Sequence, residues 1–253
     1  MPLYKTEAIV IRSMDFGESD KIVTFFTRDF GKLRGIAKGA KRTKKRFGGT
    51  LELFSYINLI FFDKENLGLI RINSCYSIKT YMEIFKDIQK VAYGSYFVEL
   101  VSGLVGEREK NNGIFNLLID SLSRINCQKN DEEIARIFEI RLLSLLGYEP
   151  QLEQCLICAH KLSRREKFWF SAVKGGILCN KCSHGLKRLS PISLGTLRIL
   201  LFARDMDFKK IHRIVFSNQA LKESEDALTD FIYYQTGKQQ NSMNFIRKIK
   251  RLR

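Results

Sequence analysis

Four cysteines in two closely spaced pairs place the strongest constraint on how this chain can fold. Each pair has the form Cys-x-x-Cys, and 20 residues separate the pairs; the four are Cys155, Cys158, Cys179 and Cys182. A tight turn in such a pair directs two thiolates at one metal ion, and two turns complete the four-sulfur tetrahedron of structural zinc. Cysteine would then take every coordination position, so none remains for water. The spacing predicts a structural Zn²⁺ site without a catalytic role.

Other interpretations of the quartet stay open: free buried thiols, an iron site or redox-labile disulfides. His160 and His184 lie next to the two pairs and could replace a ligand, but a complete cysteine quartet favours surface or supporting roles for them. Cys75 and Cys127 have no partner motif. We expect both of them in the hydrophobic core, where free cysteine behaves as a small apolar side chain.

The second constraint is charge. The 253 residues include 43 Lys and Arg against 27 Asp and Glu, a net charge of +16, which argues for an anionic partner and most commonly for nucleic acid. One stretch holds eight basic residues and no acid: Lys32, Arg34, Lys38, Lys41, Arg42, Lys44, Lys45 and Arg46. No packed core can hold that charge. The stretch is either a solvated surface loop or, with its interspersed glycines, a segment that follows a phosphate backbone.

Alternation along the first part of this stretch gives its orientation. Lys32, Arg34 and Ile36 share one face of an expected strand, so both cations are predicted to face the nucleic acid. Phe47 closes the stretch, and it is either a base-stacking residue or a core anchor. We predict that the eight cations form the nucleic-acid-binding site.

Hydrophobic patterning predicts an α+β protein. Residues 3–80 contain five short segments rich in β-branched and aromatic residues, at 7–12, 21–27, 32–37, 51–62 and 68–72, which fits a small OB-fold β-barrel. Helical periodicity begins near residue 81. The expected parts are an OB-fold domain at 1–80, a helical domain at 81–150 and 188–236, an embedded four-cysteine zinc ribbon at 151–187, and a basic mobile tail at 237–253.

Glycine, serine and proline residues indicate two helix boundaries. Gly147, followed by Pro150, is expected to end a helix, because glycine readily takes the left-handed conformation of a C-terminal cap. Ser190 and Pro191 together resemble a cap and a first-turn proline, and they are expected to begin the next helix.

Several classes of protein are disfavoured by what the sequence does not contain. It shows no secretory signal and no run of about 20 apolar residues, so we expect a cytoplasmic protein without a membrane partner. P-loop, HExxH and GxSxG motifs are absent, so we expect no enzyme. Asp15, Glu18 and Asp20 could hold magnesium, but a turn is the better interpretation. A nuclease remains the enzymatic rival.

Ordered blocks along nearly the whole chain resemble the bacterial RecO family of DNA repair proteins. The blocks occur at the family's intervals, at residues 6–11, 17–22, 30–33, 37–42, 47–54, 145–150 and 175–179. The short, lysine-rich tail departs from the family pattern, so the resemblance implies nothing there.

The resemblance implies a recombination mediator. Such a protein binds single- and double-stranded DNA, anneals complementary strands, and helps load RecA onto strands coated with single-strand binding protein (SSB). The implied partners are RecR, often RecF, and the acidic C-terminal tail of SSB. That tail needs an apolar groove with a basic rim, for which the candidates are Arg136, Arg141, Arg198, Arg204 and Lys209. The favoured interpretation of each one is an ordinary surface charge. A zinc-ribbon RNA-binding or ribosome-associated protein is the alternative from another class.

Overall fold

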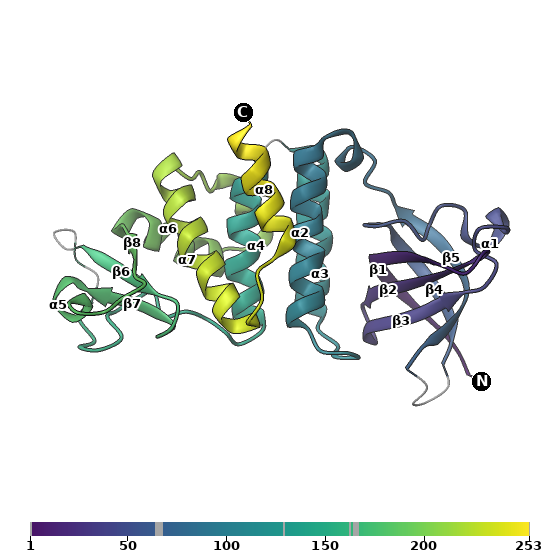
Figure 1. Ribbon diagram of the computed structural model, residues 1–253, viewed down its shortest axis with the longest axis horizontal. Helices are drawn as coiled ribbons and strands as arrows, with labels where there is room; N and C mark the ends of the chain where they lie inside the picture. The colour runs from purple at the N-terminus through teal and green to yellow at the C-terminus, as the bar shows by residue number, and fades with distance from the viewer. Residues whose placement is uncertain (1, 64–67, 129, 162, 164–166, 253) are drawn as a thin grey trace. The chain divides into compact units, whose positions relative to one another are not determined.

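The computed structural model describes residues 2–63, 68–128, 130–161, 163 and 167–252, apart from the side chains of residues 44, 45, 208, 209 and 212 (Figure 1). The chain divides into two compact units. The first unit is Met1–Lys129 with Asn241–Arg253, and the second unit is Asn130–Gln240. Within the described ranges, no helix is long and apolar enough to cross a membrane.

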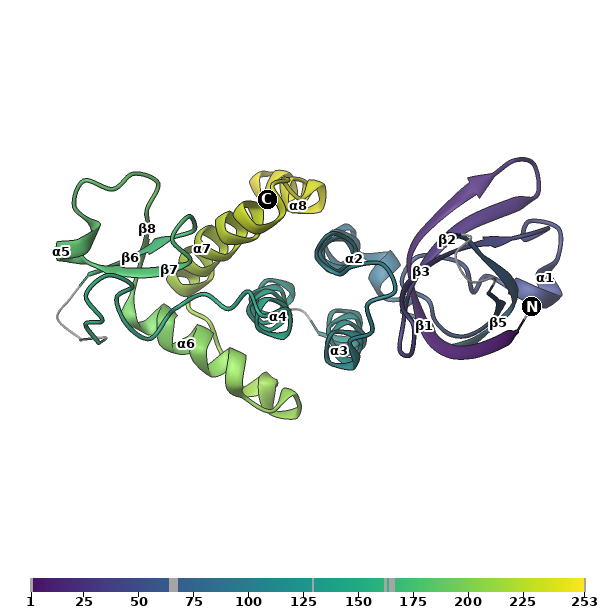
Figure 2. The ribbon, with the colours of Figure 1, turned by 90° about the horizontal axis from the view of Figure 1, so that it is seen from below.

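The first unit begins with the predicted OB-fold barrel. Among the described residues, five strands close it in the order β1-β2-β3-β5-β4, and only the β3–β5 pair is parallel. The strands are β1 (Leu3–Phe16), β2 (Asp20–Thr27), β3 (Gly31–Ala37), β4 (Tyr56–Phe62) and β5 (Ile70–Lys79). Figures 1 and 2 show them curving around one interior. Closure leaves one face of each strand for the core and one for other contacts.

Alternating apolar residues fill the barrel. Leu33 and Ala37 on β3, and Leu59 and Phe61 on β4, point inward and are buried. The strand expected at 51–62 is shorter than predicted, because residues 51–54 form turns and β4 begins only at Tyr56. Phe54 has a φ of 68°, a left-handed conformation that interrupts an extended strand, although its ring is buried.

Helices complete the first unit. They are the short α1 (Lys44–Phe47), the single 3₁₀ turn η1 (Ile84–Lys86), α2 (Ile88–Leu104), α3 (Asn112–Cys127) and α8 (Asn241–Arg251). Asp87 caps α2 by accepting a hydrogen bond from the N–H of Gln89, and Asn111 caps α3 in the same way from Ile114. These carboxylate and amide oxygens satisfy donors that have no partner inside the helix.

The basic tail is helical rather than mobile, which corrects the prediction for residues 237–253. Helix α8 packs against α2, with Met243 and Ile246 buried, and both views show the two helices adjacent (Figures 1 and 2). Apolar residues three and four apart give α8 one apolar side, which helical periodicity alone could have revealed.

The second unit contains three longer helices and a small sheet. The helices are α4 (Asp131–Leu145), α6 (Leu194–Asp205) and α7 (Asn218–Thr236), with the 3₁₀ turn η2 (Phe208–Arg213) between the last two. In the described part of this unit, the sheet has the order β7-β6-β8, formed by β6 (Phe168–Ser171), β7 (Gly176–Cys179) and β8 (Ser190–Ile192), and the short α5 (Asn180–Ser183) follows β7. Gly147 follows α4 with a φ of 75°, as predicted.

Two sequence expectations differ from this unit. Ser190 and Pro191 belong to the edge strand β8, where proline needs no ladder partner for its nitrogen, and Ser193 instead caps α6. The expected helical domain at 81–150 and 188–236 is also divided. Helices α2 and α3 group with the barrel, while α4, α6 and α7 group with the cysteine-bearing sheet.

Candidate nucleic-acid interface and metal centre

The basic stretch begins on the barrel wall and continues into the loop after β3. Leu33 and Ala37 face the barrel core, whereas Arg34 and Lys38 are exposed. The predicted alternation on β3 is therefore present, with Lys32 and Arg34 on the outward face. The two outward cations nevertheless have different surroundings.

Lys32 is buried and is already bound by the protein. Its Nζ donates hydrogen bonds to the carbonyl oxygens of Ser102 (2.9 Å) and Val105 (2.8 Å) at the end of α2, and it lies 3.3 Å from Glu107. A cation at a helix C-terminus satisfies carbonyls that have no partner inside the helix and favours the helix dipole. The expectation that Lys32 contacts DNA is corrected: its ammonium group holds the barrel to α2.

Two cations missed by the sequence analysis lie beside Arg34. Arg12 on β1 pairs with Thr24 on β2, which pairs with Arg34, so the three side chains project from the same outward face. Arg71 on β5 pairs with Ile36 on that face too. Arg12, Arg34 and Arg71 are all exposed. Alternation within each strand could have shown that these arginine side chains point outward, but only the pairing of the strands shows that they are neighbours.

The loop after β3 is held by the acidic hairpin between β1 and β2. Lys41 Nζ lies 2.9 Å from Asp15, Arg42 lies 3.8 Å from Glu18, and the N–H of Gly39 donates to Asp20 at 2.8 Å. The Lys41 hydrogen bond lowers the pKa of Asp15, and the Gly39 N–H, aided by Ser19, lowers the pKa of Asp20. Glu18 thus lies in the turn between β1 and β2, as favoured, while Asp15 and Asp20 lie at the adjoining strand ends, and the three acids orient the basic loop.

Arg46 and Phe47 anchor the end of the loop. Arg46 donates to the carbonyl oxygen of Asn73 on β5, and its guanidinium lies 4.8 Å from the centre of the Phe47 ring. Phe47 is 3% exposed within the barrel core, so of its two interpretations the core anchor is the one observed. The predicted contacts Lys44 and Lys45 have side chains outside the described part of the structure.

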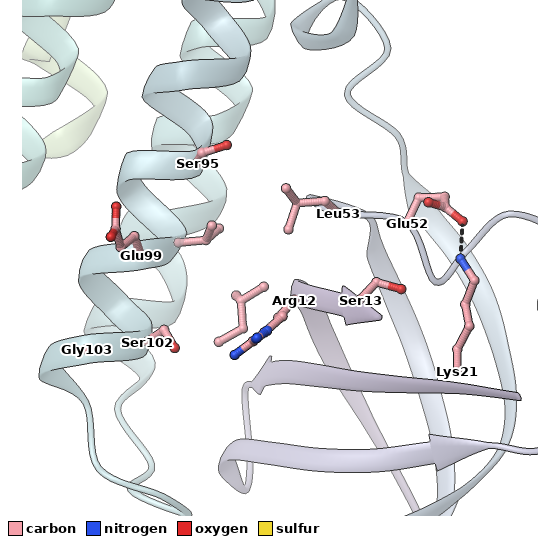
Figure 3. Close-up of a pocket in the computed structure, with 11 residues that line it drawn as sticks. Arg12, Ser13, Lys21, Glu52, Leu53, Ser95, Glu99, Ser102 and Gly103 are labelled. Atoms are coloured by element: carbon pink, nitrogen blue, oxygen red, sulfur yellow. Dashed lines mark hydrogen bonds and ion pairs between the residues drawn. The ribbon is translucent and has the colours of Figure 1, made fainter. Parts of the chain in front are cut away.

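A groove of about 540 Å³ adjoins this surface (Figure 3). It lies between β1 and α2, and Arg12, Leu53, Ser95, Glu99 and Ser102 are among its lining residues. Arg12 projects from β1 toward α2 in the close-up, whereas Lys21 is joined to Glu52 at 2.8 Å. The groove therefore has a cationic edge that is continuous with the outward face of the barrel.

The cysteine quartet converges on one point in the second unit. The four sulfur atoms of Cys155, Cys158, Cys179 and Cys182 lie within 4.8 Å of one another, and Cys158 and Cys179 are 3.8 Å apart. Tetrahedral coordination with Zn–S bonds of about 2.3 Å separates sulfurs by about 3.8 Å. The first pair lies in turns, whereas the second begins at the end of β7. The arrangement fits a structural metal.

Backbone donors favour the thiolate form of Cys155, whereas hydrogen bonding to Cys155 raises the pKa of Cys158, and burial with the neighbouring cysteines raises the pKa of Cys182 to about 12. Burial acts to raise the pKa of Cys155, but N–H groups of Cys158, Cys179 and Ile157 outweigh it and lower that pKa to about 6. A lowered pKa provides the deprotonated sulfur that a metal requires. When bound, zinc would crosslink the turns of the first pair to the end of β7 and to α5. His160 and His184 are not in the described ligand cluster.

The other two cysteines differ from each other. Cys75 lies in the barrel core, as predicted, and burial raises its pKa to about 12. Cys127, at the end of α3, is exposed, so its predicted core position is wrong. The final turn of a helix places side chains on all sides, and the apolar residues around Cys127 did not determine which side it takes.

The arginines considered for an SSB-tail groove have varied surroundings. Arg136 is buried with its partner Glu139 at 2.9 Å, and Arg141 donates to the carbonyl oxygens of Ala203 and Met206. Arg204 contacts three acids, Glu149, Glu153 and Asp205. Arg198 is exposed, and the side chain of Lys209 lies outside the described residues. Three of the five therefore have structural contacts within the unit.

Comparisons with known proteins agree across the chain. Residues 1–81 match the family model "Recombination protein O N terminal", and residues 86–244 match "Recombination protein O C terminal". Similar proteins include one from Syntrophus aciditrophicus, 36% identical over 98% of this chain and 97% of the relative, and one from Desulfatibacillum aliphaticivorans, 34% identical over 99% of both. Both are named DNA repair protein RecO. Since both family models and full-length relatives match, this chain belongs to the RecO family of DNA repair proteins.

Proposed function

We propose that this protein is a DNA-binding recombination mediator. It binds single- and double-stranded DNA, anneals complementary strands and helps load RecA onto strands coated with SSB. The observation that carries the proposal is the row of exposed cations on the OB-fold barrel, Arg12, Arg34 and Arg71, beside the loop that holds Lys38, Lys41 and Arg42. Membership of the RecO family supports it.

The site suits annealing because annealing requires no bond chemistry. Two polyanions must be brought together, and flexible cations can screen their repulsion while bases pair. The acids nearest the loop, Asp15 and Asp20, accept hydrogen bonds from Lys41 and Gly39, which makes them supports for the loop. We therefore propose a protein without enzymatic activity that acts in the cytoplasm at the nucleoid.

The proposal includes a structural Zn²⁺ ion held by Cys155, Cys158, Cys179 and Cys182. Its proposed protein partners are RecR, RecF, RecA and the C-terminal tail of SSB. The exposed Arg198 on α6 is the remaining described candidate for the rim of an SSB-tail groove.

The loop can be tested with the triple variant Lys38→Ala/Lys41→Ala/Arg42→Ala. Losing three phosphate contacts should weaken single-strand binding and reduce the slope of log K against log salt by about 2, since each contact contributes about 0.7. A control variant removes three exposed cations elsewhere, Lys86, Arg213 and Lys222. An unchanged slope in the loop variant would refute this binding site.

Function itself is tested by annealing of strands already coated with SSB, without magnesium. The wild-type protein should accelerate annealing, and removing the acidic tail of SSB should abolish the acceleration. If magnesium is then added and the strands are cleaved, the protein is a nuclease instead. Preference for structured RNA over single-stranded DNA in competition would indicate the RNA-binding alternative.

A further inference from the structure

The C-terminal helix α8 carries charge that the proposed interface does not use. Residues 237–253 contain six basic residues and no acid. The RecO family model ends at residue 244, so most of α8 lies beyond the matched region. This charge is held on a folded element of the first unit, because α8 packs against α2 (Figures 1 and 2).

The beginning of α8 is fixed by one side chain of α2. Glu99 accepts hydrogen bonds from the N–H groups of Asn241 and Ser242, each at 2.9 Å. A carboxylate at this end of a helix satisfies free donors and interacts favourably with the helix dipole. In Figure 3, Glu99 lies on α2 at the edge of the groove. Together with buried Met243 and Ile246, this contact determines which side of α8 faces outward.

The outward side combines cations with an aromatic ring. Phe245, Lys248 and Arg251 follow one another at intervals of three residues, so they lie close together on the helix surface, and all three are exposed. Like charges at such spacing repel each other. Both cations lie in the last turn of α8, where the helix dipole favours positive charge, and a polyanion bound there would relieve their mutual repulsion.

We propose that the outward face of α8, formed by Phe245, Lys248 and Arg251, is a second nucleic-acid-binding surface that holds a separate strand. The cations contact backbone phosphates, and the exposed ring stacks on a base, which is the combination that single-stranded nucleic acid binds. An anionic membrane is a poorer match, because an amphipathic helix binds lipid through its apolar side. Here that side is buried against α2.

The location of α8 explains why the strand would be a separate one. Both views of the first unit place α1, which ends the basic loop, on the side of the barrel away from α2, whereas α8 lies against α2 (Figures 1 and 2). One strand on the loop and another on α8 would bring two strands to one protein. This inference rests on the proposed DNA-binding function and extends it.

The test compares three variants of the full-length protein. The α8 variant is Lys248→Ala/Arg251→Ala, the loop variant is Lys38→Ala/Lys41→Ala/Arg42→Ala, and the control is Arg213→Ala/Lys222→Ala, which removes two exposed cations from the second unit. Salt dependence of single-strand binding is measured for each. Energy transfer between donor- and acceptor-labelled strands that are not complementary reports bridging. Light scattering verifies that each variant has the same molecular mass in solution as the wild-type protein, and thermal melting verifies that each variant is folded.

The α8 variant should lose bridging and should reduce the salt slope by about 1.4, as expected for two phosphate contacts. The control should match wild type. Should the α8 variant behave like wild type while the loop variant loses salt dependence, the second surface is wrong and the proposed function stands. If neither variant changes the slope, the proposed DNA-binding site fails as well. Loss of binding to anionic phospholipid vesicles, with bridging intact, would overturn the inference in favour of a membrane surface.

Discussion

Lys32 and Arg34 lie two residues apart on one face of β3, yet their side chains meet different neighbours. The ammonium group of Lys32 is enclosed by the end of α2 and donates to Ser102 and Val105, whereas Arg34 is exposed beside Arg12. A buried cation with two carbonyl partners stabilises the fold, because removing it leaves those carbonyls without a donor. An exposed cation on a barrel wall is available to an anion.

This difference predicts opposite effects for two matched variants. Lys32→Met should lower the free energy of unfolding by about 1–3 kcal/mol, since the carbonyls of Ser102 and Val105 lose their donor. Arg34→Met should change it by less than about 0.5 kcal/mol. Urea unfolding measures both. For single-stranded DNA, we expect Arg34→Met to weaken binding and Lys32→Met to leave it near wild type; the reverse pattern would contradict these roles.

At the scale of the structural elements, strand β7 is hydrogen-bonded to the segment that carries the first cysteine pair, and it ends at the first cysteine of the second pair. The N–H of Gln151 donates to Gly175, the N–H of Ile177 donates to Gln151, and the N–H of Leu156 donates to Ile177. These bonds hold the segment of the first pair along the strand that leads into the second pair. The convergence of the cysteine quartet therefore depends on a close backbone approach as well as on the spacing of the four cysteines.

Gly176 allows that approach, and its substitution tests it. A Cβ atom at Gly176 would lie 2.4 Å from the carbonyl oxygen of Gln151, which is too close for any side chain. Gly176→Ala should therefore separate the two segments, so that zinc is lost faster to a competing chelator in a colorimetric assay. Gly195→Ala in the first turn of α6 is the control, because its nearest contact is 3.8 Å away. Equal zinc loss from both variants would disprove the importance of this contact.

At the scale of the whole molecule, the chain forms two units and returns to the first at its end. Residues 130–240 make the second unit, and α8 then joins the barrel, α2 and α3. The cysteine quartet thus lies in a different unit from the basic stretch. Each unit has its own buried apolar residues, such as Phe25 in the barrel and Phe138 in α4.

Metal removal should accordingly affect one unit. Treating the protein with a zinc chelator should increase hydrogen exchange in β6 and β7, because the crosslink between the first cysteine pair and the end of β7 is lost. Exchange in the barrel strands should stay unchanged. Mass spectrometry of peptides from both units measures this. A Cys155→Ser variant is the control, since chelator should alter it little. Equal deprotection of the barrel would show that the units are not independent.

The sequence by itself determined features that depend on neighbouring residues. Alternation predicted the strands of an OB-fold barrel, cysteine spacing predicted the convergent quartet, and glycine predicted the end of α4. Each follows from local backbone geometry. Tertiary structure decided which cations are free to meet an anion: it buried Lys32 and aligned Arg12 with Arg34. It also turned the basic tail into a helix against α2. Such outcomes depend on contacts between residues far apart in the chain, which no local pattern contains.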